Sequence, residues 1–209
     1  MVDQQREPVE RRVILSGALA SLAVGTAACS GGAAQAGVDA VTAVNDFRTA
    51  EPGGFGSEAI DVAALADFHS EVEANNGFLY RPAARAWLVS YPEEFIAQAK
   101  EVYPEEMHEG LDVGVVALFQ KCPHLGCRVP ECGASQQFEC PCHGSMYTHY
   151  GEHLVGPAPH GMYMFPTRIV DGRVMVDTST VIEGLPHGTN VTDWVLSDES
   201  CLGSATTES

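Results

Sequence analysis

Two short runs of the sequence concentrate residues that bind metals: positions 122–127 read CPHLGC and positions 140–145 read CPCHGS. Structural zinc sites pair their ligands as C-x2-C or H-x3-H around one ion, and the spacings here differ from that pattern. Each run instead offers one cysteine and one histidine close together, Cys122 with His124 and Cys140 with His143. This mixture suits two sulfide-bridged irons, one held by two thiolates and the other by two imidazoles.

The two runs resemble the cluster-binding loops of Rieske iron-sulfur proteins, over residues 110–180 of this chain. The sequence GPAP at 156–159 resembles the third, proline-bearing loop that covers the cluster in that family. Pro123 departs from the threonine of many members without removing a ligand. The resemblance implies one [2Fe-2S] cluster bound by Cys122, His124, Cys140 and His143, a disulfide between Cys127 and Cys142 that joins the loops, and a cover made of Leu125, Gly156, Pro157, Ala158 and Pro159.

The ligand mixture bears on the redox potential, because two thiolates leave a less negative cluster than four, and histidine ligation raises the potential. Ser145 and Tyr147 occupy positions where high-potential members of the family place hydroxyls aimed at sulfur, so we expect a potential toward the upper end of the range. The resemblance also implies that His124 and His143 contact quinol and couple its oxidation to proton transfer, with Leu125 as an apolar neighbour.

The remaining histidines and cysteines have simpler interpretations. We do not expect His149 and His153 to bind metal, and His160 beside the third loop is a candidate for modulating the cluster. Cys132 and Cys201 either form a disulfide that pins the acidic C-terminal tail to the cluster region or remain free thiols. We interpret three further histidines as surface residues: His69, His108 and His187.

Composition limits the other possibilities. At 209 residues and 45% hydrophobic content, the chain has material for one ordinary globular domain and an appendage. The formal net charge of -17 argues against nucleic acid as a partner, because binding its phosphates takes clustered Lys and Arg.

The N-terminal part is predicted to be an export or membrane-anchor segment. Residues 1–12 contain the pair Arg11-Arg12 and form a cytoplasmic region, and residues 13–34 are a hydrophobic helix of about 33 Å, enough to cross a bilayer core of about 30 Å. Three interpretations remain open: a twin-arginine signal, a lipoprotein signal with lipidation at Cys29, or an uncleaved anchor. All place the domain on the outer face of a bacterial cytoplasmic membrane, N-terminus inside, behind a flexible linker at 35–57.

Residues 58–180 are predicted to form an all-β domain, an antiparallel Rieske-type sandwich with a small inserted cluster-binding subdomain at about 120–160. Asp171-Gly172 predicts a hairpin between two alternating runs. We expect a helix only at 92–107, as an insertion between strands, and an extended acidic tail over 181–209.

The resemblance implies an electron-transfer subunit of a cytochrome bc-type complex, the redox subunit of a quinol:cytochrome c oxidoreductase. Its partners would be membrane quinol, a b-type cytochrome subunit and a c-type cytochrome, and the chain alone would be an electron carrier. The alternative is the small Rieske subunit of an exported molybdenum oxidoreductase such as arsenite oxidase. A b-type cytochrome or a molybdopterin protein that co-purifies with the chain would distinguish the two.

Overall fold

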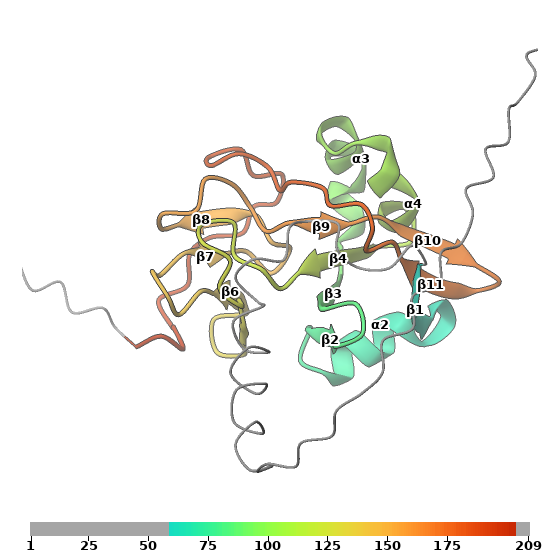
Figure 1. Cartoon of the computed structure of the whole chain (residues 1–209), viewed down its shortest axis with the longest axis horizontal. Helices are drawn as coiled ribbons and strands as arrows, with labels where there is room; N and C mark the ends of the chain where they lie inside the picture. The colour runs from blue at the N-terminus through green and yellow to red at the C-terminus, as the bar shows by residue number, and fades with distance from the viewer. Residues whose placement is uncertain (1–58, 204–209) are drawn as a thin grey trace, which may run out of the picture. The chain divides into compact units, whose positions relative to one another are not determined.

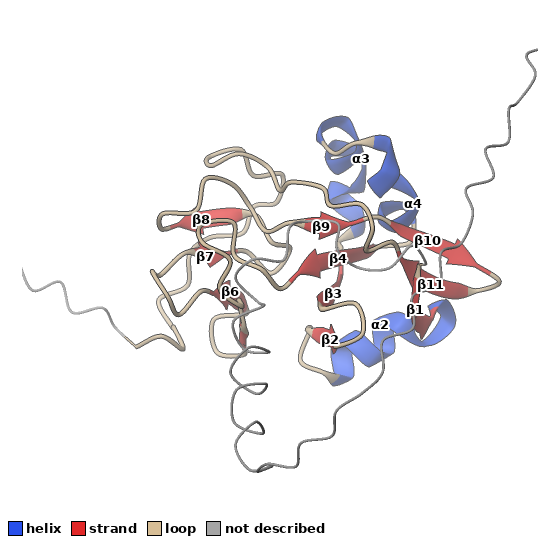
Figure 2. Cartoon of the chain, in the orientation of Figure 1, coloured by secondary structure: helices blue, strands red, loops and turns tan. Residues whose placement is uncertain are grey.

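The computed structural model describes residues 59–203, which form three antiparallel sheets and a few helices (Figure 2). The predicted, mostly antiparallel β architecture is confirmed, whereas the predicted N-terminal helix at 13–34 lies outside the described residues. Within residues 59–203, no helix has the length and apolar character to cross a bilayer. The first sheet contains β1 (Ile60–Ala64), β11 (Arg173–Val176) and β10 (Thr167–Val170); the second contains β2 (Leu79–Arg81), β3 (Ala86–Ser90), β4 (Val115–Phe119) and β9 (Met164–Phe165); the third contains β5 (Glu131–Cys132), β6 (Gln137–Glu139), β7 (Met146–Tyr147) and β8 (His153–Val155).

Strand β4 is buried on both faces and joins two cores. Successive side chains of a strand point to opposite faces, so Val115, Ala117 and Phe119 pack with residues of β1, β11 and α2 (Leu65–Ala74). Val116 and Leu118 pack on the other side, with residues of the third sheet and of the helices between β3 and β4. The continuous apolar run VVALF reflects this double burial.

The helices confirm one prediction and correct another. Between β3 and β4 lie α3 (Glu93–Val102), the short 3-10 helix η2 (Glu105–Met107) and α4 (His108–Asp112), where the helical insertion at 92–107 was expected. The expectation that this was the domain's only helical segment was wrong, because α2 follows directly on β1. Phe68 and Val72 are the buried residues of α2, four positions apart on one face.

The predicted hairpin is confirmed between β10 and β11, which pair antiparallel from Thr167↔Val176 to Val170↔Arg173. Asp171 and Gly172 both have positive φ, of 49° and 72°, as a type I′ turn requires. Val174 and Val176 are buried and Arg173 is exposed, so the alternation places one face of β11 in the core.

The third sheet, β5 to β8, lies in the sequence between β4 and β9 and carries the metal-binding motifs at its loops (Figure 1). Residues 181–203 contain no helix or strand, in line with the expected tail, yet they are attached to the domain. Ile182 exchanges backbone hydrogen bonds with Met164 of β9, and Cys201 forms a disulfide with Cys132 of β5. We call residues 181–203 the C-terminal strap.

Candidate metal centre

The two motif-bearing loops have the same backbone closure. In the first, the N–H of Cys122 donates to the carbonyl of Cys127 (2.7 Å), and the N–H of Gly126 donates to Cys122 (2.8 Å). The second repeats this at the same spacing: Cys140 donates to Ser145 (2.8 Å) and Gly144 to Cys140 (3.1 Å). Gly126 and Gly144 both have positive φ, a conformation that favours glycine. Each loop therefore folds back tightly around its first cysteine.

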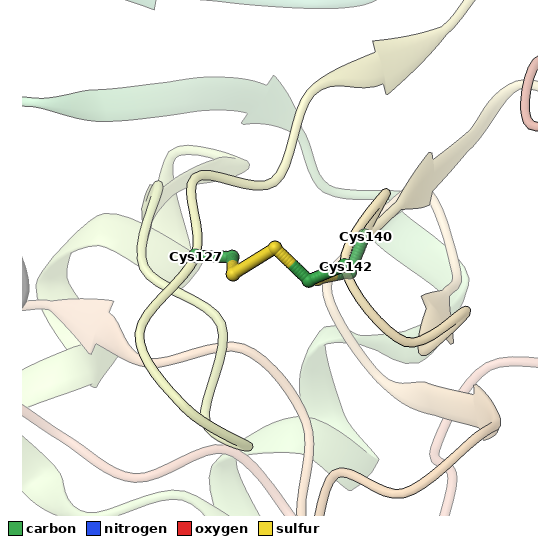
Figure 3. A group of neighbouring side chains, drawn as sticks. All are labelled: Cys127, Cys140 and Cys142. Carbon is green, nitrogen blue, oxygen red and sulfur yellow. A yellow bond between two sulfur atoms is a disulfide. The ribbon is translucent and has the colours of Figure 1, made fainter.

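A disulfide between Cys127 and Cys142 joins the loops, as the resemblance implied (Figure 3). The sulfur of Cys140 lies within 4.8 Å of both sulfurs of this bond. Because Cys127 and Cys142 are bonded to each other, they are not free to bind a metal. Among residues 59–203 the free cysteines are Cys122 and Cys140, one from each loop.

Each of the two loops contributes two of the four expected ligands, a cysteine at its start and a histidine within it. Cys122 and Cys140 are buried, whereas His143 is exposed and His124 half-buried. The two imidazole rings lie 4.8 Å apart between centroids and are nearly perpendicular, at 89°. The loops therefore present two sulfurs on the inside and two imidazoles toward the surface, a donor set that fits a [2Fe-2S] cluster with mixed ligation.

Electrostatics also favour a cation at the two cysteines. Burial is the main cause that raises the pKa of the Cys140 thiol, and the neighbouring Cys122 raises it further. Two thiolates in this interior are costly unless a positive charge accompanies them, which bound iron would supply.

A buried tyrosine contacts one of these sulfurs. The hydroxyl of Tyr147 lies 3.2 Å from Sγ of Cys122. Burial raises the pKa of Tyr147, and the contact with Cys122 raises it further. The phenol therefore keeps its proton and can donate a hydrogen bond to sulfur. The predicted influence of Tyr147 on the potential therefore has a contact to act through.

The third loop presses against the second. The N–H of Ala158 donates to the fully buried Oγ of Ser145 (3.1 Å), which leaves the hydroxyl proton available for another acceptor. A Cβ at Gly156 would lie 2.5 Å from Cα of Ser145, so only glycine allows this approach. Leu125, at the end of the first loop, is 65% exposed.

The other histidines form contacts that sequence alone did not reveal. His149 is buried against Phe78 and stacks on Trp194 of the strap, and burial lowers its pKa to about 4. Nδ1 of His153 lies 2.7 Å from Nδ1 of His187, which is exposed, as expected of a surface residue. The ring of His160 packs against Tyr163 and its Nδ1 lies 2.7 Å from the carbonyl oxygen of Gly161.

Apart from Cys201, the strap residues that reach the third sheet were also missed. Cys132 and Cys201 form a disulfide, which resolves the alternatives left open by the sequence. Two buried carboxylates, Glu139 and Glu152, accept hydrogen bonds from the strap. In the sequence, Glu139 is an acid between the apolar residues of QFEC, whereas Glu152 lies between Gly151 and His153 and has no such signal. Cys29, the candidate for lipidation, lies outside the described residues.

Comparison with known proteins assigns the domain. Residues 93–166 match the family model for the Rieske [2Fe-2S] domain. The chain is 37% identical over 65 residues to cytochrome b6-f complex iron-sulfur subunit 3 of Nostoc sp., a match that covers 31% of this chain and 36% of that protein. It is 40% identical over 70 residues to the cytochrome b6-f complex iron-sulfur subunit of Prochlorococcus marinus, with coverage of 34% and 39%.

These matches span less than half of each relative, and a solved structure is more distant. The plasma membrane Rieske protein PetC3 from Synechocystis PCC 6803 aligns with a TM-score of 0.37 and 23% identity, covering 56% of this chain and 97% of that chain. The chain contains a Rieske [2Fe-2S] domain, and this domain binds one [2Fe-2S] cluster.

Proposed function

We propose that this chain is the electron-transfer subunit of a cytochrome bc-type complex. In this role it takes one electron from membrane quinol and passes it to a c-type cytochrome, beside a b-type cytochrome subunit. The observation that carries the proposal is the distribution of the four ligand candidates: sulfurs inside, and imidazoles accessible at the loop ends. The relatives named as cytochrome b6-f iron-sulfur subunits support the same assignment.

Each ligand candidate has a separate task in this proposal. Cys122 and Cys140 hold one iron from within, and their loops are locked by the Cys127–Cys142 disulfide. When bound, the cluster supplies the acceptor for one electron. His124 and His143 would hold the second iron, each through one ring nitrogen, and they remain accessible to solvent. The other ring nitrogen, when deprotonated, would accept the proton released by a quinol hydroxyl.

The surroundings of the imidazoles suit an apolar substrate with a polar hydroxyl. Leu125 lies next to His124 and is largely exposed, which offers apolar contact to a quinone ring at the entrance to the site. Tyr147, through its contact with the Cys122 sulfur, and Ser145 raise the potential of the cluster. The segment at 13–34 tethers the domain to the outer face of the cytoplasmic membrane.

Gentle membrane extraction of the full chain, followed by identification of the proteins that co-purify, tests this role. We expect a b-type cytochrome and quinol-dependent reduction of the cluster. A molybdopterin protein in its place would support the small subunit of an exported molybdenum oxidoreductase.

The ligand assignment is tested separately: reduced protein should give the paramagnetic spectrum of mixed Cys/His ligation, and Cys122→Ser and His143→Ala should each abolish it.

A further inference from the structure

The C-terminal strap meets the end of the third loop through two backbone hydrogen bonds. The N–H of Gly161 donates to the carbonyl of Leu185 (2.9 Å), and the N–H of His187 donates to the carbonyl of Pro159 (3.3 Å). Pro159 is the last residue of the GPAP sequence, so the strap is attached directly to this loop. We call the two paired backbone segments the seam: residues 159–161 and 185–187.

A pair of histidines adds a side-chain contact to the seam. Nδ1 of His153, on β8 before the third loop, lies 2.7 Å from Nδ1 of His187 on the strap. The two rings are 4.6 Å apart between centroids and inclined at 69°. In a hydrogen bond between two such nitrogens, one carries the proton and the other offers a lone pair. The contact therefore exists only while at least one of the two imidazoles is neutral.

The surroundings of His153 disfavour a positive charge. The residue is 2% exposed, its ring packs edge-on against Tyr147, and its Nε2 is buried without a hydrogen-bond partner. Burial is the main cause that lowers the pKa of His153, and the neighbouring His187 and His160 lower it further. The backbone of Gly156 acts in the opposite direction, to a smaller extent.

The acids near this pair in the sequence are engaged elsewhere. Glu152 precedes His153, but its carboxylate accepts hydrogen bonds from backbone N–H groups of the strap. Glu183 is exposed, and its charge acts on Tyr163, where burial is the larger cause of a raised pKa. Within residues 59–203, neither histidine of the pair takes part in an ion pair. No ion-paired carboxylate in this part of the chain therefore compensates a second positive charge at the pair.

We infer that the His153–His187 pair is an acid-sensitive latch, which holds the strap against the end of the third loop. When both imidazoles are protonated, both Nδ1 atoms are donors and the two positive charges repel each other, so the seam opens. A buried neutral histidine stabilises the closed form above about pH 6.5, and this contribution is lost as the pH falls below that value. The latch acts whether or not the electron donor is a quinol.

The test is hydrogen exchange of the purified full chain with its cluster, at about pH 7.5 and about pH 5. The reporters are the N–H groups of Gly161 and His187, which donate across the seam. After correction for the intrinsic effect of pH on exchange, we expect these groups to exchange roughly tenfold faster at the lower pH. Residues 167–176 of the β10–β11 hairpin are the internal reference and should keep their protection.

Two substitutions of the exposed His187 separate a latch from a passive contact. His187→Gln supplies an amide that can donate to a neutral His153 or accept from a protonated one, so the seam should stay closed at both pH values. His187→Leu removes the contact, so the seam should exchange fast at both. The inference is overturned by an unchanged pH response in His187→Gln, by wild-type protection in His187→Leu at pH 7.5, or by equal loss of protection in the hairpin.

The control variant is His149→Leu, because His149 is a second buried histidine in contact with the strap, through Trp194. It should leave the pH response of the seam at the wild-type level. A seam that no longer responds to pH in His149→Leu would assign the effect to His149 and refute the latch.

Discussion

At the scale of single residues, the contact between the Tyr147 hydroxyl and the Cys122 sulfur predicts a tuned redox potential. A hydrogen bond to a charged group contributes about 1.5 kcal/mol, and if it favours the reduced cluster by that amount the one-electron potential rises by about 60 mV. Tyr147→Phe should therefore lower the midpoint potential by tens of millivolts, and Ser145→Ala should act in the same direction. Redox titration of each variant measures the shift.

Tyr103→Phe is the control, because this buried tyrosine follows α3 and lies outside the cluster loops. It should leave the potential unchanged. Equal shifts in Tyr103→Phe and Tyr147→Phe would show that loss of a buried hydroxyl, rather than contact with the ligand, changes the potential.

His149 predicts a dependence of stability on pH. Burial lowers its pKa from 6.5 to about 4, so between these pH values the unfolded chain binds more protons than the folded one. Stability is therefore retained above pH 6.5 and decreases as the pH falls toward 4, by about 3 kcal/mol in total. His149→Leu should flatten this part of the curve, measured as the free energy of urea unfolding between pH 4.5 and 7.5.

Burial also lowers the pKa of His153, which adds a dependence of the same sign. The slope of the His149→Leu variant should therefore decrease without vanishing. An unchanged slope would mean that His149 is not buried in its neutral form.

At the scale of loops and strands, the third loop depends on a glycine. Gly156 has φ +98°, and a Cβ there would meet the Cα of Ser145 at 2.5 Å and the carbonyl oxygen of Gly144 at 2.8 Å. Backbone atoms cannot rotate away, so Gly156→Ala should displace the loop. The loss of folding free energy should exceed the roughly 1–3 kcal/mol that backbone strain alone would cause. We expect a lower melting temperature and reduced iron content after purification.

Gly172 provides the comparison, because it has φ +72° but nothing within 4 Å of an added Cβ. Gly172→Ala should cost only about 1–2 kcal/mol of strain and leave iron content at the wild-type level. Similar iron loss in both variants would argue against a specific role for the contact between the second and third loops.

Elements were predictable from sequence where the signal is local. Asp171-Gly172 specifies its turn through backbone conformations that few residues adopt, and α3 shows a helical pattern that is free of strand signals. Helix α2 was missed because it follows β1 without a turn residue: its N-cap is Ala64, with no side-chain capping bond. The apolar residues of IDVAA and LADF therefore form one continuous run in the sequence, and this pattern predicts a strand rather than a strand followed by a helix.

At the scale of the whole molecule, the sequence left long-range pairing open. The ligand candidates are recognisable because each pair lies within one loop. Cys132 and Cys201 are separated by 69 residues, and only the path of the strap brings them together. The partners of Glu139 and Glu152 were likewise not predictable, because most of the donors that they bind belong to the strap.

The two disulfides should contribute differently to stability and to cluster retention. Chain-entropy arguments assign about 3 kcal/mol to a loop of 15 residues and about 4 kcal/mol to one of 69. Cys201→Ser should therefore destabilise the fold at least as much as Cys127→Ser. Cluster retention should follow the opposite order, because only the shorter bridge joins the two ligand-bearing loops. Unfolding curves and iron content of both variants provide the measurement; a Cys201→Ser protein that loses its iron while Cys127→Ser keeps it would contradict this division of roles.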